Sequence, residues 1–451
     1  MPVTPDSIRS SVREVLPSVR ADLEALVRIP SVSADPGRRD DVRRSAELTA
    51  KLFEGEGFDD VQILTAGEGA PAVVARKPAP DGAPTVLLYA HHDVQPVGDP
   101  ADWDSDPFEP TERGDRLYGR GAADDKAGIA AHLAAVRSFG GDLPVGVTVL
   151  VEGEEEIGSP TLEAFLGEHQ ELLAADVIVI ADSGNWDIGE PALTTSLRGL
   201  VDCFVEVRTL DHGVHSGMWG GVVPDAVMTL VRLLASLHDD EGNVAVRGLV
   251  SGPAADVDYP EDRIRAESGV ADGVSFIGSG PMVERLWTKP AIAVIGFDAT
   301  RTDDASNTLI PSAKAKISVR LAPGDSAAAA MDRLREHLEA HVPWGAQLTF
   351  TRGDLGEPMQ IDATGPAYDA ARAAFRDAWD GVEPVDMGVG GSIPFVAAFR
   401  GAYPDAAVLV TGVEDPDTRA HGANEGLHLA EFERVCVAEA LLLANLAAAS
   451  I

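Results

Sequence analysis

Short apolar segments that alternate with helical segments constrain the fold of this chain more than any other feature. Residues 85–90, 145–151 and 176–181 are rich in Val, Leu and Ile, and each has the length of a buried strand. Residues 127–139 and 160–173 lie between them and have the composition of helices. Strands that alternate with helices are typical of an α/β sheet with crossover connections. We therefore expect this part of the chain to form an α/β domain, preceded by a helical region with a break near Pro30.

The pattern changes near residue 195. Residues 200–207 alternate between apolar and polar side chains, which is typical of a sheet with one covered face. A four-stranded sheet backed by two helices would account for the segments that follow: strands 291–297, 313–321 and 346–352, and helices 225–237 and 326–340. Beyond about residue 360 the first pattern returns, with helix 365–379, strand 406–411 and helix 429–448. We predict a smaller α+β domain, residues 195–358, inserted into a larger α/β domain formed by residues 1–194 and 359–451.

The net charge of −37 excludes two classes of partner. Binding of nucleic acid needs an excess of Lys and Arg, and so does binding to an anionic membrane surface. The chain has only two cysteines, Cys203 and Cys436, so it has no disulfide framework, which fits a reducing compartment. The first residues lack the basic and apolar segments of a signal peptide, and no apolar run reaches the length of a membrane span. We therefore expect a cytoplasmic protein.

Histidine and acidic residues gather where the strands of the α/β domain end. They are His91-His92-Asp93 after the first strand, Glu152-Gly153-Glu154-Glu155-Glu156 after the second, Asp182 after the third, Asp124-Asp125 before a helix, and His421 after strand 406–411. In open α/β sheets, ligands bind beyond the carboxyl ends of the strands. Five loops therefore deliver imidazole and carboxylate groups to one edge of the sheet.

Such a set of side chains suits zinc or manganese, because both metals accept imidazole and carboxylate ligands. Two metal ions about 3.5–4 Å apart can activate a water molecule and polarise the carbonyl group that it attacks. One further carboxylate is needed to carry the proton of the water to the leaving amine. Glu155 and Glu156 are adjacent, so one can be a ligand while the other stays free. Each motif alone has a structural explanation, such as helix capping by Asp124, and only their combination indicates a metal site.

Several motifs of the chain resemble those of a known family. Three segments look like the metallopeptidase family of carnosinase and cytosolic non-specific dipeptidase: Tyr89–Pro96, Gly119–Lys126 and Glu152–Ser159. Aminoacylase-1, glutamate carboxypeptidase and succinyl-diaminopimelate desuccinylase are more distant members. Further matches follow in family order, at Val179–Asp182, His215–Gly221, Asn307–Pro311, Gly390–Pro394 and His421–Glu425. The resemblance implies a zinc-exopeptidase-like catalytic domain with a mixed sheet and an inserted lid and dimerisation domain.

The resemblance also implies two divalent metal ions in each subunit. His91 and Asp182 would hold one ion, Glu156 and His421 would hold the other, and Asp124 would bridge the two. Zn²⁺ is the expected metal, and Mn²⁺ or Co²⁺ fits the same ligands.

Further roles follow from the same family pattern. The first histidine of the motif is the ligand, which selects His91 over His92. Asp93 would orient His91 through its other ring nitrogen. Glu155 would be the general base. The peptide bond between Asp124 and Asp125 would be cis.

The inserted domain would supply residues that contact the substrate. Arg320 would bind the carboxylate of the substrate, because a guanidinium group binds a carboxylate in a two-pronged way. Asn307 or Thr308 would lie near the substrate, and Gly391 and Ser392 would line the same pocket. These assignments predict a small peptide substrate with a free C-terminal carboxylate.

His215 lies in a glycine-rich loop of the inserted domain, where glycines let the backbone approach another surface closely. The metal ligands include no donor for the oxyanion that forms during amide hydrolysis, and such a donor commonly raises the rate by about 10²–10³-fold. In similar dimeric enzymes the matching histidine reaches into the active site of the partner subunit. We therefore expect a homodimer in which His215 is catalytic.

We predict hydrolysis of dipeptides by a metal-activated water. Val94-Gln95-Pro96 and Asp125-Lys126 favour this activity over that of an N-acyl amino acid amidohydrolase or a desuccinylase. An alternative of another class is a non-catalytic acidic protein that binds divalent ions. That alternative predicts a missing ligand or a missing Glu155, and none is missing. Three departures from the family pattern, at Ala90, His92 and Glu154, bear on substrate preference.

Overall fold

The computed structural model describes residues 4–253, 255–391 and 394–449. The chain divides into two compact units, and each is described by itself. Unit 1 comprises Met1–Thr195, Asp362–Met387 and Pro394–Ile451, and unit 2 comprises Ser196–Ile361 and Gly388–Ile393. In the described ranges, no helix combines the length and the apolar character that a membrane crossing requires.

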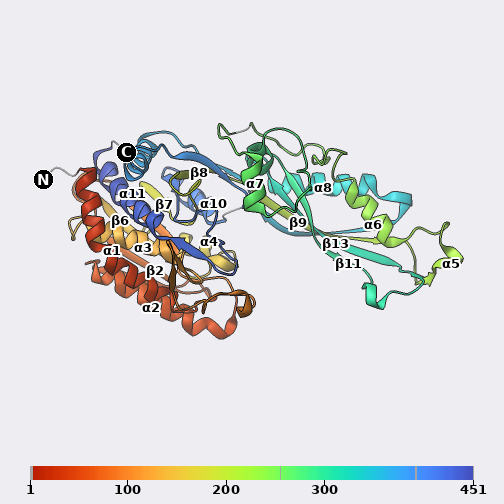
Figure 1. Cartoon of the computed structure of the whole chain (residues 1–451), viewed down its shortest axis with the longest axis horizontal. Helices are drawn as coiled ribbons and strands as arrows, with labels where there is room; N and C mark the ends of the chain where they lie inside the picture. Colours follow the sequence, from red (N-terminus) through yellow and green to blue (C-terminus); the bar gives the residue numbers. More distant parts are fainter. Residues whose placement is uncertain (1–3, 254, 392–393, 450–451) are drawn as a thin grey trace. The chain divides into compact units, whose positions relative to one another are not determined.

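A mixed sheet forms the centre of unit 1 (Figure 1). Its order is β1-β2-β6-β3-β7-β17-β8-β15, and β16 also pairs with β8. β3 runs parallel to β6 and β7, β17 runs parallel to β7, and the outer pairs are antiparallel. The strands are β1 (Asp60–Leu64), β2 (Ala72–Lys77), β3 (Thr85–His91), β6 (Gly146–Glu152), β7 (Val177–Ile180), β8 (Ala192–Leu197), β15 (Met359–Gln360), β16 (Val385–Val389) and β17 (Ala407–Val410). Of these, β15 and the last two residues of both β8 and β16 fall within unit 2. The prediction of a mixed-sheet α/β fold is confirmed.

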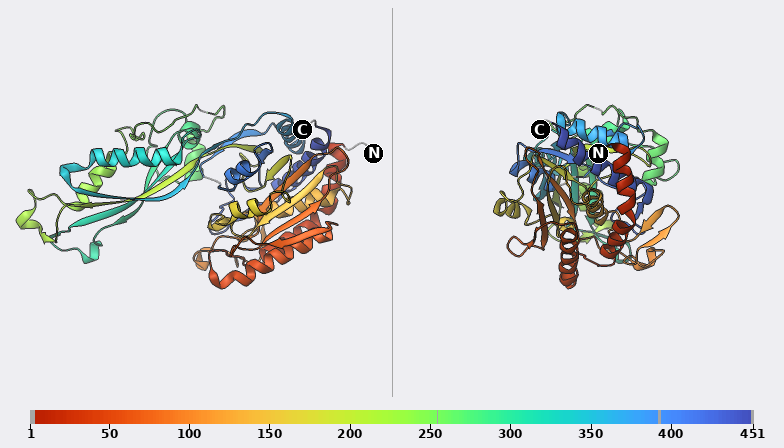
Figure 2. Two further views of the ribbon diagram at one scale, coloured as in Figure 1. Left: turned by 180° about the vertical axis from the view of Figure 1, so that it is seen from behind. Right: turned by 90° about the vertical axis from the view of Figure 1, so that its left-hand side faces the viewer.

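Helices pack against this sheet. They are α1 (Pro5–Val27), α2 (Arg39–Gly55), α3 (Lys126–Ser138), α4 (Leu162–Glu168), α9 (Pro366–Ala378), α10 (Pro394–Ala402) and α11 (Leu429–Ala448). α1 and α11 come from opposite ends of the chain and lie side by side, as the views in Figures 1 and 2 show. α1 begins where the side chain of Thr4 accepts the backbone N–H of Ser7 in a capping box. The helical region is interrupted near Pro30, as predicted, since residues 28–35 are not helical.

Smaller elements complete unit 1. β4 (Thr111–Arg113), β5 (Arg116–Tyr118) and β18 (Gly426–His428) form a separate three-stranded sheet. Short 3₁₀ helices occur at Pro36–Arg38, Pro100–Asp102 and Glu155–Ile157. The last of these helices begins three residues after the end of β6, in the acidic segment that the sequence singles out.

Unit 2 is built on a four-stranded antiparallel sheet of order β11-β13-β9-β14. Its strands are β9 (Gly199–Arg208), β11 (Ala291–Asp298), β13 (Ser312–Leu321) and β14 (Gln347–Gly356). Alternate residues of β9 and β13 are buried together with α6 (Ala226–Ala235) and α8 (Ala327–His341), which explains their period-two pattern. Other elements are β10 (Val214–His215), β12 (Thr308–Leu309), α5 (Ser216–Trp219), α7 (Glu261–Ser268), a π-helix at Glu284–Thr288, and 3₁₀ helices at Thr302–Asp304 and Pro343–Gly345.

Candidate metal centre

The carboxyl ends of three parallel strands bring the predicted metal ligands of unit 1 together. β3 ends at His91, which is the register partner of Glu152 at the end of β6. β7 pairs with β3 on the other side and is followed by Asp182. The apolar residues of these strands are buried, so the polar side chains begin where the strands leave the core. The structure thus places these groups at one edge of the sheet, as the sequence predicts.

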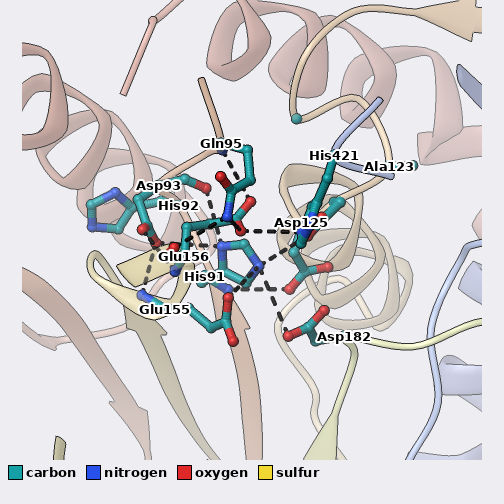
Figure 3. A network of polar contacts seen from close by, with 12 residues as sticks. His91, His92, Asp93, Gln95, Ala123, Asp125, Glu155, Glu156, Asp182 and His421 are labelled. Carbon is teal, nitrogen blue, oxygen red and sulfur yellow. Dashed lines mark hydrogen bonds and ion pairs between the residues drawn. The ribbon is translucent and has the colours of Figure 1, made fainter. Parts of the chain in front are cut away.

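Two groups of side chains share the carboxylate of Asp124. Its Oδ1 lies 3.1 Å from Nε2 of His91, whose Nε2 is also 3.9 Å from Oδ2 of Asp182. Its Oδ2 lies 3.0 Å from Nε2 of His421, which is 3.2 Å from Oε2 of Glu156. In each group the possible ligand atoms lie within 4.8 Å of one another. Figure 3 shows His91, Glu156, Asp182 and His421 converging on one region.

Asp124 stands two residues before Lys126, the first residue of α3. The peptide bond between Asp124 and Asp125 is cis, as the family resemblance implies. Asp125 accepts the backbone N–H of His91 at 3.1 Å, which joins the start of α3 to the end of β3.

Asp93 organises the residues on both sides of the site. Its Oδ1 accepts the backbone N–H of Glu155 at 3.2 Å, and its Oδ2 accepts that of Glu156 at 3.1 Å. Nδ1 of His91 lies 3.1 Å from the backbone oxygen of Asp93 and 3.4 Å from its Oδ1. Asp93 therefore holds the other ring nitrogen of His91 and also fixes the turn that carries the two glutamates.

Glu155 and Glu156 are distinguished by their neighbours. Glu156 belongs to a ligand group, whereas Glu155 belongs to neither. The carboxylate of Glu155 points toward His91, with its Oε2 3.9 Å from Nε2 of that ring (Figure 3). Gln95 donates its backbone N–H to Oε1 of Glu156 at 3.1 Å and its side-chain amide to Oε2 at 2.7 Å. Gln95 thereby holds Glu156 in the position of a ligand.

The contacts of Glu154 differ from those of Glu155 and Glu156. It accepts the backbone N–H groups of Ala70 and Thr161 and also the hydroxyl of Thr161. This buried carboxylate anchors the loop before β2 and the start of α4. The extra acidic residue at this position is therefore structural.

Burial and like charges shape the electrostatics of the cluster. Burial, reinforced by Asp182 and Glu156 against the effect of His91, raises the pKa of Glu155 to about 9. Burial, reinforced by Asp124, raises the pKa of Asp182 to about 7. Hydrogen bonds with Asp124 and Glu156 raise the pKa of His421 to about 11. Burial and mutual repulsion of these carboxylates therefore make positive charge favourable within the cluster.

One acidic neighbour of the cluster was not predicted. Glu414 follows β17, and its pKa is raised well above the ordinary value by burial and then by the carboxylates of Asp124 and Asp182. Its position after a parallel strand could have identified Glu414 from the sequence. The same criterion selects His421.

The donor set fits two divalent metal ions. Each group combines one imidazole nitrogen with carboxylate oxygens, and none of the five predicted ligands supplies sulfur. Such nitrogen and oxygen donors suit zinc, manganese or cobalt. Asp124 directs one oxygen to each group, which is the arrangement that a bridging carboxylate requires.

In unit 2 the structure brings His215, Asn307 and Thr308 together. β10 pairs with β12 in a register that places His215 opposite Thr308. The backbone N–H of Ser216 donates to the backbone oxygen of Asn307 at 2.8 Å. Nδ1 of His215 accepts the N–H of Gly217 at 3.1 Å, so a neutral ring carries its proton on Nε2. All three predicted residues are exposed, and Nε2 of His215 is available as a donor.

Arg320 lies elsewhere in unit 2. It stands near the end of β13, where it pairs with Leu200 of β9 and Ala291 of β11. The side chain is half-buried, and burial lowers the pKa of its guanidinium group. Among the described residues it has no acidic partner. Gly391 is half-buried, and Ser392 lies outside the described residues.

Comparison with known proteins identifies the family. The family model described as "Peptidase family M20/M25/M40" matches residues 87–445. This stretch includes every predicted metal ligand. The chain belongs to this peptidase family. The resemblance that the motifs indicate is thereby confirmed.

Several M20-family relatives align along nearly the whole chain. The cysteinylglycine-S-conjugate dipeptidase of Corynebacterium striatum is 36% identical over 428 residues, which cover 94% of each chain. The Beta-Ala-His dipeptidase of Rattus norvegicus is 29% identical over 443 residues, which cover 94% of this chain and 87% of the relative. The crystal structure of human carnosine dipeptidase 1 matches with a TM-score of 0.81 and 26% identity over 99% of both chains. The Dug1p dipeptidase of Saccharomyces cerevisiae shares the fold, with a TM-score of 0.82 and 23% identity.

Proposed function

We propose that this member of the M20 family is a metal-dependent dipeptidase. The observation that carries the proposal is the shared carboxylate of Asp124, with one oxygen toward His91 and the other toward His421. Glu155 stands beside this pair of ligand groups without belonging to either. The relatives that align over most of the chain are named as dipeptidases, which supports the choice of a small peptide as substrate.

We assign one metal ion to His91 and Asp182 and the other to Glu156 and His421, with Asp124 as a ligand of both. Zn²⁺ is the metal that we propose, and Mn²⁺ or Co²⁺ suits the same donors. When bound, the two ions supply an electrophile for the amide carbonyl and lower the pKa of a water molecule.

Proton transfer is the role of Glu155. Its carboxylate accepts the proton of the attacking water and passes it to the nitrogen of the leaving amine. Asp93 supports this role, since it holds the backbone N–H of Glu155 and of Glu156 with its two oxygens. Glu156 is thereby directed to the metal while Glu155 stays free to move a proton.

Substrate binding is the role of unit 2. Arg320 has no acidic partner among the described residues, and its burial strengthens an interaction with a carboxylate. We propose that it binds the C-terminal carboxylate of a dipeptide. Gly391 and Ser392 would contact the rest of the substrate. Asn307 and Thr308 lie beside His215 and, like it, would reach the substrate from the other subunit.

We also propose a homodimer formed through unit 2, in which His215 serves the active site of the other subunit. Nε2 of His215 is the free donor of this ring, and it would stabilise the oxyanion. Large apolar side chains near it are exposed to solvent, which is expected of a surface that another chain covers. They are Met218, Trp219, Val222 and Met228.

A cytoplasmic location is part of the proposal. Both cysteines are free and buried in the structure, in agreement with a reducing compartment. No observation favours the alternatives of an N-acyl amino acid amidohydrolase or a non-catalytic ion-binding protein.

A hydrolysis panel tests the proposed activity. Purified protein is incubated with Zn²⁺, Mn²⁺ or Co²⁺ and offered Cys-Gly, β-Ala-His and other dipeptides, together with N-acetyl and N-succinyl amino acids. The proposal predicts that dipeptides have the highest kcat/KM. A higher kcat/KM for acylated amino acids would contradict the proposal and support the alternative of an N-acyl amino acid amidohydrolase.

A further inference from the structure

A buried ion pair that the catalytic scheme does not use lies beside the candidate metal centre. Nη1 of Arg120 lies 2.6 Å from Oε2 of Glu425, and both side chains are almost fully buried. Arg120 belongs to the loop before α3, and Glu425 belongs to the loop after β17. A buried charged pair is costly unless other hydrogen bonds satisfy it, so the remaining contacts of the pair are informative.

Glu425 binds the backbone of the loop that ends in Asp124. Its Oε2 accepts the N–H of Gly121 at 3.1 Å, and its Oε1 accepts the N–H groups of Ala123 at 2.9 Å and Asp124 at 3.1 Å. Its backbone oxygen accepts the N–H of Gly119 at 3.1 Å. One carboxylate thus fixes the backbone on the N-terminal side of Asp124, including the amide of Asp124 itself.

The same pair also fixes the segment that carries His421. Nη2 of Arg120 donates to the backbone oxygen of Gly422 at 3.0 Å, directly after His421. His421 has a positive φ of 62°, a conformation that a side-chain-bearing residue adopts only where its surroundings enforce it. Arg120 and Glu425 therefore join the two loops whose side chains meet at Oδ2 of Asp124.

We propose that Glu425, paired with Arg120, is a positioning residue for metal binding. It sets the orientation of Asp124, which both ligand groups share, and its distance from His421. This inference rests on the proposed function, because it assumes that Asp124 and His421 hold metal. Since Asp124 belongs to both groups, loss of Glu425 weakens the binding of both ions.

The experiment measures binding of Zn²⁺ alone to the full-length protein after removal of metal with a chelator. Glu425→Gln keeps the size of the side chain but removes the charge that faces Arg120 and the N–H groups. The double variant Arg120→Met/Glu425→Gln removes both charges, which avoids an unpaired buried guanidinium group. Isothermal titration gives stoichiometry and affinity, and circular dichroism with a thermal melt verifies that each variant is folded.

A matched control exists in the same unit. Arg116 and Asp415 form another buried ion pair, at 2.5 Å. In the part of the chain that the structure describes, Asp415 makes no hydrogen bond with residues 119–125. Asp415→Asn therefore weakens a comparable pair without releasing the backbone of Asp124.

We expect Glu425→Gln and the double variant to bind both Zn²⁺ ions about 10–100-fold more weakly than the wild type, the usual effect of losing a partner that orients a ligand. Asp415→Asn should keep wild-type affinity. Wild-type affinity in the folded Glu425 variants, or an equal loss in Asp415→Asn, would overturn the inference. A wild-type protein that binds fewer than two ions would contradict the proposed function itself, and the inference with it.

Discussion

Arg320 and His215 lie toward opposite ends of strand β13. Arg320 stands eight residues after Ser312, the first residue of the strand, which corresponds to about 26 Å at the usual rise per residue. His215 pairs with Thr308, which precedes Ser312. Figure 1 shows α5, which follows His215, at that end of the unit 2 sheet. A dipeptide spans about 7 Å, so it cannot contact both residues of one chain.

Complementation between two inactive variants is the first prediction. His215→Ala should lower kcat by about 10²–10³-fold, because the oxyanion loses its donor. Mixing it with Glu155→Gln under conditions of subunit exchange should restore about a quarter of wild-type activity, since half of a random mixture is heterodimer with one complete site. Activity is compared before and after exchange, which is verified with a tagged subunit. No recovery would show that His215 does not serve a partner.

The second prediction separates proton transfer from metal binding. Glu155→Gln keeps the shape of the side chain and removes the proton acceptor, so kcat should fall by about 10²–10⁴-fold. Bound metal, measured by elemental analysis, should be unchanged, because Glu155 belongs to neither ligand group.

Glu154→Gln is the matched control in the same acidic segment. Glu154 anchors Ala70 and Thr161, so this substitution should lower the free energy of unfolding by about 1–3 kcal/mol and leave kcat nearly unchanged. If the control lost kcat and Glu155→Gln kept it, the roles of the acidic residues would have to be reassigned.

The third prediction concerns the substrate carboxylate. Amidation of the C-terminus should cost about 2–5 kcal/mol in kcat/KM, because a charged pair loses one partner. Arg320→Met should weaken hydrolysis of the free dipeptide but have little further effect on the amide. Initial rates for both substrates with both proteins form a double-mutant cycle. Equal kcat/KM for dipeptide and amide in the wild type would exclude Arg320 as the carboxylate site.

The fourth prediction concerns the pH dependence of stability. Nδ1 of His132 lies 2.7 Å from Oε1 of Glu439, and both side chains are buried. Burial lowers the pKa of His132, but the Glu439 carboxylate outweighs it, so the pKa in the folded state is raised. The stabilisation by this pair is therefore complete below about pH 6.5, the ordinary pKa of histidine, and is lost as pH rises through the folded-state pKa.

Glu439→Gln measures this effect. The melting temperature of the variant should fall furthest below that of the wild type at about pH 6, and the gap should narrow at about pH 9. Thermal melts of both proteins at the two pH values check the prediction. A gap that widens with rising pH would mean that His132 is neutral in the folded protein.

Much of the fold follows from local patterns. β3, β6 and β7 are continuous apolar runs, and β9 alternates, so burial on two faces or one face is readable from the residues. β1 and β2 were not predicted, although Asp60–Leu64 alternates weakly. β1 has only one neighbour in the sheet and is largely exposed, so it lacks the apolar run that marks a central strand.

Candidate metal ligands could be predicted because each lies at the end of a strand, in a loop that follows a strand, or just before α3. The family motifs then selected the ligands among these candidates. Asp93 was also predicted to orient His91, but Gln95 and Glu425 were not predicted as positioning residues. Gln95 acts on Glu156, which is 61 residues away, and Glu425 acts on Asp124, which is 301 residues away. Nothing in the local sequence distinguishes such a side chain from a surface residue, because its role depends on contacts that only the folded chain creates.

Metal dependence of turnover tests the central claim most directly. Protein freed of metal by chelation is mixed with increasing equivalents of Zn²⁺, Mn²⁺ or Co²⁺, and the hydrolysis of a dipeptide is followed. If two ions are held by ligand groups that share Asp124, the protein should show no turnover without metal. It should reach full activity once two equivalents are bound. Full turnover by protein that elemental analysis shows to be free of metal would contradict the account.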